Sequence, residues 1–241
     1  MNGIFWGLLC LLLCAPGWAR APRLLARAAL VYGLGEVVLM APIWAPALLF
    51  ALQFNWMGKL LSTLLALGVI YGLRWVSPAE VGLARPQPGS WRVVGLVVGA
   101  LAAWQFFEAF GARHHHPAPT AEALWFQLLA PGIAEELVFR GVLPGMLGQV
   151  FPRNLPFFGV RTSWGGVVGV VLFVLAHGIA FRGGPLQGWP QVHFTPGEVA
   201  DKLVMGSLFL WVRERTGSCY AAMATHNLMN TCLAVGHALL R

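Results

Sequence analysis

The sequence predicts an all-α fold, a polytopic transmembrane helical bundle of about eight spans, from its composition and from the length of its apolar runs. The chain is 58% hydrophobic and 10% charged, whereas an ordinary soluble domain has about 45–50% and about 25%. A water-soluble core of 241 residues would leave large apolar patches exposed. Several runs approach the ~20 residues that cross a bilayer. The bilayer is therefore predicted to be the solvent for most of the chain.

The first two apolar runs, at residues 4–18 and 24–54, differ in their flanking charges and in their proline content. No Lys or Arg precedes the run at residues 4–18, so it is predicted to be a retained anchor rather than a cleaved secretory signal. Residues 24–54 contain Pro42 and Pro46, which predicts either one kinked span or a span followed by a re-entrant piece. The remaining predicted spans are residues 60–76, 93–111, 121–150, 165–181, 203–212 with their flanks, and 219–240.

The basic residues predict an orientation. In the eight-span arrangement ten arginines share one side: Arg20, Arg23, Arg27, Arg74, Arg85, Arg92, Arg153, Arg161, Arg213 and Arg215. The other side has five basic residues: Lys59, Arg113, Arg182, Lys202 and Arg241. The positive-inside bias then places both termini outside the cytoplasm. Arginines facing anionic lipid explain most of the net charge of +7, so no nucleic-acid partner is expected.

The cysteines and one histidine cluster have ordinary structural interpretations. Cys10, Cys14, Cys219 and Cys232 lie in predicted spans without C-x-x-C spacing, which favours small packing residues. The three histidines at 114–116 follow Arg113 and are predicted to form a solvated loop, although adventitious metal binding is the alternative.

A charged cluster interrupts the apolar run at residues 121–150. An ionised group near a bilayer centre costs roughly 2.5–3.5 kcal/mol and therefore needs a partner or a function. Glu136 and Arg140 are four residues apart on one helix face, so they are predicted to pair. Glu135 then lacks a local counter-charge. Pro131 and Gly132 predict that a helix restarts there, which would place Glu135 near a positive dipole end.

Two further polar pairs follow on later spans. His177 lies four positions after Phe173, and Asn230 lies four positions after His226, so each pair shares a helix face. Either histidine alone would be interpreted as a satisfied core residue. Together with Glu135 they supply a carboxylate, two imidazoles and a carboxamide, a set that can activate water and stabilise an oxyanion.

These motifs carry a family resemblance. E-E-x-x-x-R, F-x-x-x-H and H-x-x-x-N occur in this order on successive apolar segments, which resembles the CPBP family of intramembrane glutamic endopeptidases. That family includes eukaryotic type II CAAX prenyl proteases and bacterial proteins linked to bacteriocin processing or immunity. The resemblance covers roughly residues 122–237. It implies that residues 113–241 form the catalytic region and residues 1–112 the N-terminal transmembrane helices of one integrated membrane domain.

The resemblance also implies residue roles. Glu135 would be the general base, His177 would help it hold water, and His226 with Asn230 would form the oxyanion site. Glu136, Arg140 and Phe173 would support this arrangement. The resemblance implies no cofactor. Zinc is the alternative, because two histidines and a carboxylate can form a catalytic zinc site. The H-E-x-x-H signature of many zinc proteases is absent, which favours metal-free catalysis.

The expected function is therefore hydrolysis of a peptide bond in a membrane-associated or C-terminal segment of a protein or peptide, in a prokaryotic inner membrane. A non-catalytic immunity or peptide-binding protein is one alternative. A proton-coupled transporter is another, although no inverted repeat is visible. The predicted orientation places His177 and Asn230 in the non-cytoplasmic half of the membrane. A prenylated C-a-a-X substrate requires a cytoplasmic site, so these two expectations disagree.

Overall fold

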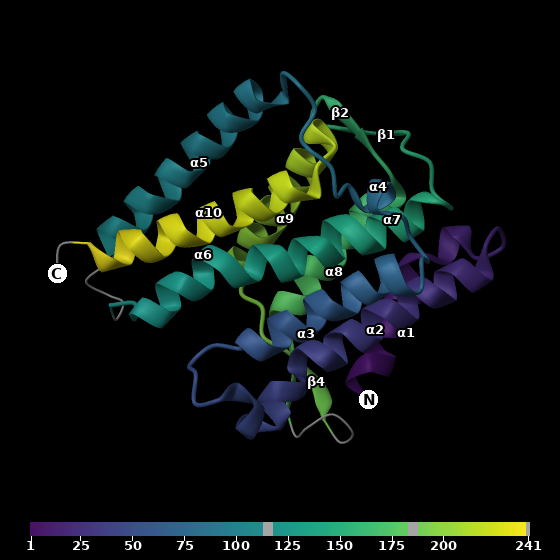
Figure 1. Ribbon diagram of the computed structural model, residues 1–241, viewed down its shortest axis with the longest axis horizontal. Coiled ribbons are helices and arrows are strands. Elements are labelled where there is room, and N and C mark those ends of the chain that lie inside the picture. Colours follow the sequence, from purple (N-terminus) through teal and green to yellow (C-terminus); the bar gives the residue numbers. More distant parts are fainter. Residues whose placement is uncertain (113–117, 183–187, 240–241) are drawn as a thin grey trace.

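The computed structural model describes residues 1–112, 118–182 and 188–239, of which most are helical (Figure 1). Arg113, the three histidines at 114–116 and Arg241 lie outside the described residues. The main helices are α1 (Asn2–Leu13), α2 (Pro22–Trp44), α3 (Trp56–Leu67), α4 (Pro78–Val81), α5 (Ser90–Ala112), α6 (Ala121–Glu136), α7 (Leu143–Gly148), α8 (Trp164–Gly178), α9 (Pro196–Thr216) and α10 (Cys219–Ala238). Two antiparallel strand pairs join them: β1 (Leu155–Phe157) with β2 (Val160–Thr162), and β3 (Ile179–Arg182) with β4 (Trp189–Val192).

Each predicted apolar run contains a helix, but the number of membrane spans is not confirmed. Among the described residues, only α2 and α5 are long and apolar enough to cross a membrane by length and composition. The 12 residues of α1 rise about 18 Å, which is short of the ~30 Å hydrocarbon core. The two small sheets also depart from the predicted all-α fold. The eight spans therefore stay a prediction.

The uncertain segment at residues 24–54 resolves into one long helix and a short turn. Helix α2 continues through Pro42 and ends at Trp44, and a single 3₁₀ turn, Pro46–Leu49, follows it. Ala45 precedes a proline and is driven away from helical backbone angles, which ends α2. The Asn55 side chain then caps α3 by accepting a hydrogen bond from the Gly58 amide (2.9 Å).

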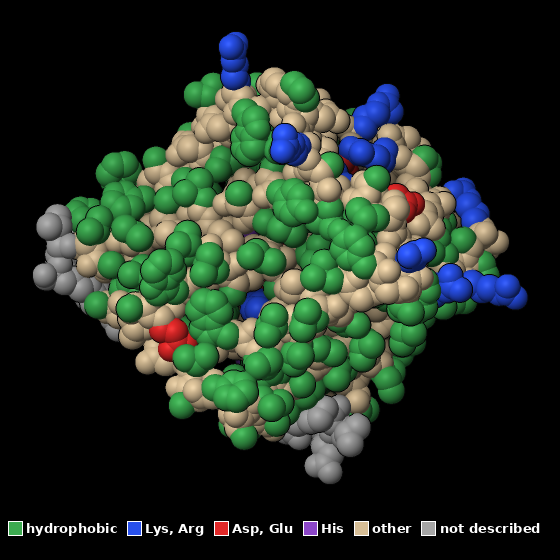
Figure 2. Space-filling view, viewed as in Figure 1, with side chains coloured by type: hydrophobic (Ala, Val, Ile, Leu, Met, Phe, Trp, Pro, Cys, Tyr) green, Lys and Arg blue, Asp and Glu red, His purple; other side chains and the backbone are tan. Residues whose placement is uncertain are grey.

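The predicted arginine-rich side corresponds to one end of the bundle. Long-range hydrogen bonds tie the chain together there: Trp164 Nε1 donates to the Leu13 carbonyl (2.8 Å), and the amide of Gln87, in the loop before α5, donates to the Thr216 carbonyl (2.8 Å). Figure 2 shows Lys and Arg side chains along the upper and right edges of the view, where Figure 1 places α4, β1 and β2. The grouping of the arginines at one end follows from helices that alternate in direction.

Large apolar side chains cover the outside of the bundle between its two ends. Figure 2 shows them over much of the visible face. Examples with more than half of their surface exposed are Leu8, Leu30, Leu64, Leu96, Trp104, Phe107 and Trp125. A water-soluble monomer rarely exposes a continuous apolar surface of this kind, because its hydration is unfavourable. This surface fits a lipid environment.

The predicted helix restart at Pro131 and Gly132 is wrong. Both residues lie inside α6, which runs without a break to Glu136. The proline ring disturbs the helical hydrogen bonds of the turn around it, and Asn227 of α10 supports this turn by accepting from the Gly132 amide (2.7 Å) and donating to the Leu129 carbonyl (3.3 Å). A side chain at 132 would approach within 2.5 Å of Asn227 Oδ1, so this close helix contact requires glycine.

The dipole argument for Glu135 fails for the same reason, because Glu135 lies in the last turn of α6 rather than the first. A π-helix, Leu137–Val142, follows directly. Such wide turns are frequent at functional sites. Cys219 packs there, with its Sγ 3.4 Å from the Glu136 carbonyl oxygen. The four cysteines are free and at least partly buried, as small packing residues would be.

Candidate functional site

Three helices bring the four predicted catalytic residues to one cavity. Glu135 is on α6, His177 on α8, and His226 and Asn230 on α10; all four line a cavity of about 1050 Å³. Figure 1 shows α6 running beside α10, and these two helices pack closely along their lengths. Phe173, one helical turn before His177, lines the same cavity. The sequence motifs thus converge in space.

Glu135 is largely buried, with 13% of its side chain exposed. Its Oε1 atom accepts a hydrogen bond from Lys59 Nζ at 2.5 Å. Its Oε2 atom has no hydrogen-bond partner among the described residues, and it lies 3.8 Å from Nε2 of His177. The carboxylate therefore has one oxygen held by a cation and one oxygen available to a small polar molecule.

Lys59 is the principal site residue that sequence reasoning missed. The sequence predicts only that it lies on the arginine-poor side. In the structure it belongs to the first turn of α3, 76 residues before its partner Glu135. A lysine beside an apolar run of more than a dozen residues was the available signal, because a buried cation needs an anion. The sequence does not specify which carboxylate that anion is.

Glu136 and Arg140 form the predicted ion pair, in which Arg140 Nη1 donates to Glu136 Oε1 (3.0 Å). Both side chains are fully buried. Arg140 Nη2 also donates to the Gly206 carbonyl (2.9 Å), and the guanidinium lies over the Phe173 ring, with Cζ 4.3 Å from the ring centre. The pair therefore connects α6, the π-helix, α8 and α9.

His226 shares this carboxylate. Its Nδ1 lies 2.8 Å from Glu136 Oε1, so the imidazole donates to the carboxylate and keeps Nε2 free to act elsewhere. Its ring stacks on Phe209 with 4.5 Å between ring centres. Glu136 is thus a partner of both Arg140 and His226, whereas the sequence predicted only the first contact.

His177 is oriented by its own helix. Its Nδ1 lies 2.8 Å from the Phe173 carbonyl oxygen, which accepts the Nδ1 proton. In the neutral imidazole Nε2 then carries the lone pair, and this is the atom that faces Glu135. The Phe173 ring supports the imidazole at 4.4 Å between ring centres.

Asn230 lines the cavity but does not contact Glu135 directly. Its Nδ2 donates to Oε1 of Gln127 on α6 (2.9 Å). Sequence reasoning missed Gln127, because a single glutamine in an apolar helix carries no motif. One Nδ2 proton of Asn230 is used in this contact and the other is available.

Replacing Lys59 with Met is expected to lower both stability and the activity of this site. The Glu135 carboxylate would lose its counter-charge while staying buried, and removing one member of a buried pair costs about 3–5 kcal/mol. We expect a lower unfolding temperature in detergent and a turnover at least tenfold lower in whatever reaction the site performs. Lys59→Arg keeps the charge and should recover part of both.

Lys202→Met is the matched control for this test. Lys202 lines the rim of the same cavity but pairs with a solvent-exposed carboxylate, Asp201. Surface pairs of this kind contribute little to stability, so the control should keep the unfolding temperature of the wild-type protein. A Lys59→Met protein with wild-type turnover would contradict the importance of the Lys59–Glu135 pair.

One comparison with known proteins gives a match. Residues 117–232 match the family model described as "Type II CAAX prenyl endopeptidase Rce1-like". The match confirms the family resemblance of the three motifs and includes every predicted site residue, whereas Lys59 precedes it. No curated protein and no solved structure matches the chain.

Proposed function

Residues 117–232 belong to the Rce1-like family of type II CAAX prenyl endopeptidases, and from this premise we propose how the site acts. The family consists of integral membrane proteases, and its substrates are membrane-associated proteins. We propose that Glu135 is the general base and that His177 helps it hold the attacking water. One observation carries this proposal: Glu135 Oε2 is buried, has no hydrogen-bond partner among the described residues, and faces His177 Nε2 across 3.8 Å beside a large cavity.

The proposed reaction is direct hydrolysis. A water bound between Glu135 Oε2 and His177 Nε2 gives a proton to the carboxylate as its oxygen attacks the carbonyl carbon of the peptide. The tetrahedral intermediate collapses when the C–N bond breaks and the amine takes the proton from Glu135. The products are a carboxylic acid and an amine, which exchange a proton to become a carboxylate and an ammonium group, and no covalent enzyme intermediate forms. Lys59 donates to Oε1 of Glu135, which leaves Oε2 to accept the proton.

His226 and Asn230 are proposed to stabilise the oxyanion. Glu136 accepts the Nδ1 proton of His226 and orients its ring, so that Nε2, when it carries a proton, donates to the developing negative charge. Asn230 adds its second Nδ2 proton. Arg140 keeps Glu136 in place, so the second carboxylate of the motif acts through His226 rather than on water.

We propose that this reaction needs no metal ion. The Lys59 ammonium lies 2.5 Å from Glu135 Oε1, and a cation there repels a second cation bound to the same carboxylate. This contact supports the metal-free alternative.

The cavity lining supports an orientation and a substrate class. Among the residues at its outer end are Ala112, Pro119, Gly197 and Asp201, which lie where α5 ends and where α6 and α9 begin. This is the arginine-poor end of the bundle. By the positive-inside bias the site would open away from the cytoplasm of a prokaryotic inner membrane. The proposed substrate is therefore the membrane-spanning or C-terminal segment of an exported protein or peptide rather than a cytoplasmic prenylated protein.

Cysteine labelling in intact cells tests this orientation. Asp201→Cys, at the cavity rim, should react with a membrane-impermeant maleimide added outside the cells. Arg215→Cys, at the opposite end of α9, should react only after permeabilisation. The native cysteines at 10, 14 and 219 are buried, and a Cys232→Ser background removes the fourth. The reverse labelling pattern would place the site at the cytoplasmic face and restore a C-a-a-X-type substrate.

A further inference from the structure

A second cavity lies behind the catalytic carboxylate. It has a volume of about 170 Å³ and is bounded by α1, α2, α3, α6, α8, the π-helix and β3. Only three described residues line both this cavity and the large one: Lys59, Glu135 and His177. These three side chains therefore form a wall between the two spaces. We call the smaller space the rear chamber.

The rear chamber contains polar groups in an otherwise apolar lining. Glu36 of α2 is 8% exposed and Asn2 of α1 is 1% exposed. Asn2 Oδ1 has no hydrogen-bond partner among the described residues, and neither does Glu135 Oε2. Buried acceptors of this kind are normally satisfied by ordered water where space allows. At about 30 Å³ of liquid volume per molecule, the chamber has room for several waters.

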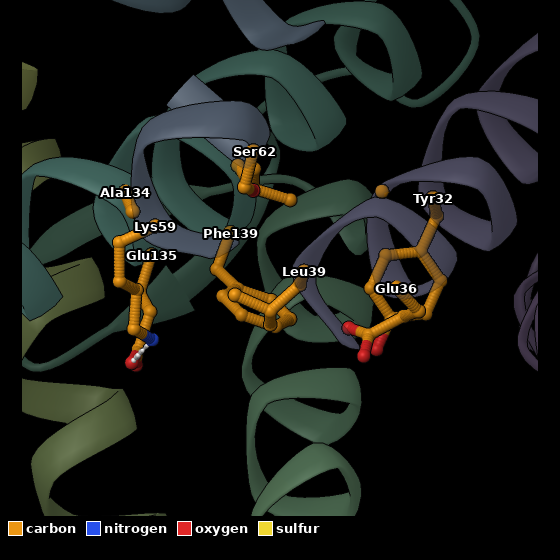
Figure 3. A pocket seen from close by; sticks show the side chains of 10 residues that line it. Tyr32, Glu36, Leu39, Lys59, Ser62, Ala134, Glu135 and Phe139 are labelled. Carbon is orange, nitrogen blue, oxygen red and sulfur yellow. Dashed lines mark hydrogen bonds and ion pairs between the residues drawn. The ribbon is translucent and has the colours of Figure 1, made fainter. Parts of the chain in front are cut away.

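A smaller adjoining space extends this polar region. It has a volume of about 20 Å³ and is also lined by Glu36, Lys59 and Glu135, and one water needs about 10–15 Å³ on this measure. Figure 3 shows Lys59 and Glu135 directed toward each other on one side and Tyr32 with Glu36 on the other, with Phe139 and Leu39 between them. The buried carboxylate of α2 thus faces the region behind the reacting pair.

Hydrolysis inside a membrane requires a water supply. Each cleaved bond consumes one water, and a peptide that fills the large cavity excludes bulk water from Glu135 on that side. We propose that the rear chamber is a water-binding site that delivers the attacking water to Glu135 and His177 from behind the substrate. Glu36 and Asn2 hold this water. Ala180 of β3 lines the chamber and is exposed at the arginine-poor end of the bundle. In this proposal, bulk water therefore enters the chamber from that end.

This inference rests on the proposed hydrolytic function, but the water itself can be detected without any substrate. Met40 lines the chamber, and radiolytic hydroxyl radicals oxidise side chains that contact bound water. In nanodiscs we expect strong oxidation of Met40, whereas the buried Met146 and Met229 should stay protected. Equal protection of all three methionines would show that the chamber is dry and would overturn the proposal, whether or not the protein cleaves peptides.

Two substitutions then test whether the chamber delivers water to Glu135. Ala176→Leu places a larger side chain in the chamber, and Glu36→Leu removes its buried carboxylate. We expect each to reduce Met40 oxidation severalfold and to lower kcat at least tenfold, with KM within twofold because the substrate cavity is untouched. Glu36→Gln keeps polar groups and should recover much of the loss. A lipid-facing control with the same size change, Ala103→Leu on α5, should match the wild-type protein.

The two readouts separate the possible failures. If Ala176→Leu and Glu36→Leu both abolish Met40 oxidation while kcat stays at the wild-type value, water reaches Glu135 by another route and the delivery role is wrong. If the wild-type protein oxidises at Met40 but cleaves nothing, the proposed function fails and the proposed delivery fails with it. The water site itself would survive that outcome.

Discussion

Glu135→Gln is expected to abolish peptide-bond cleavage while the protein still folds and inserts. Glutamine has nearly the same shape and can still accept a hydrogen bond from Lys59, but it cannot take a proton from water. Loss of a general base typically costs 10²- to 10⁴-fold in rate, and we expect a fall of about 10³-fold. The measurement is single-turnover cleavage of a membrane peptide by purified protein in nanodiscs, with thermal unfolding recorded in parallel.

Glu122→Gln provides the matched control on the same helix. Glu122 accepts hydrogen bonds from the amides of Gln53 and Phe54 (both 3.1 Å) and lies at the start of α6, outside the cavity lining. It should keep the wild-type rate.

His177→Ala should resemble Glu135→Gln, because the attacking water loses its second hydrogen-bond partner. Wild-type cleavage by Glu135→Gln or His177→Ala would exclude the proposed roles, and inactivation by a chelator that zinc alone reverses would establish the metal alternative.

Arg140→Leu is expected to have the largest effect on stability. Glu136 and Arg140 are fully buried, and removing one member of such a pair leaves an uncompensated charge that costs about 3–5 kcal/mol. The substitution also removes the contact with the Gly206 carbonyl. We expect low membrane yield, a markedly lower unfolding temperature in detergent and little cleavage. Arg215→Leu, at an exposed position near the end of α9, should be close to wild type.

A double substitution separates folding from catalysis. Glu136→Leu with Arg140→Leu removes both charges, and apolar replacement of a buried pair is often neutral. The double variant should therefore recover part of the lost stability. Its cleavage rate should stay low, because His226 no longer has the carboxylate that holds its Nδ1. An Arg140→Leu protein as stable as the wild type would show that the pair is dispensable.

Local patterns predicted much of the site. The helices follow from apolar runs, and the Glu136–Arg140 pair follows from a four-residue spacing that any helix would bring together. The order of the three motifs was enough to identify the family, and five of the motif residues line one cavity: Glu135, Phe173, His177, His226 and Asn230. Such predictions succeed because each depends on neighbours within one helical turn or on a whole motif.

Contacts between helices that are far apart in the chain could not be predicted from the sequence. Lys59 meets Glu135 only because α3 packs against α6, and Gln127 meets Asn230 only because α6 packs against α10. The error at Pro131 has the same origin: proline normally ends or kinks a helix, but Asn227, 95 residues beyond Gly132, accepts a hydrogen bond from the Gly132 amide and supports this turn. Glu36 belongs to none of the three motifs, and its position behind Glu135 depends on how α2 packs against α3.

The proposal that Glu135 directs hydrolysis of a membrane substrate is tested most directly in the native host. Membrane and exported proteins of cells carrying Glu135→Gln are compared by mass with those of cells carrying Glu122→Gln. We predict that at least one protein keeps an uncleaved C-terminal or membrane-spanning segment only in the Glu135→Gln cells, and that purified wild-type protein removes this segment. Identical protein masses in the two strains, with both variants inserted at equal levels, would contradict proteolysis by this site.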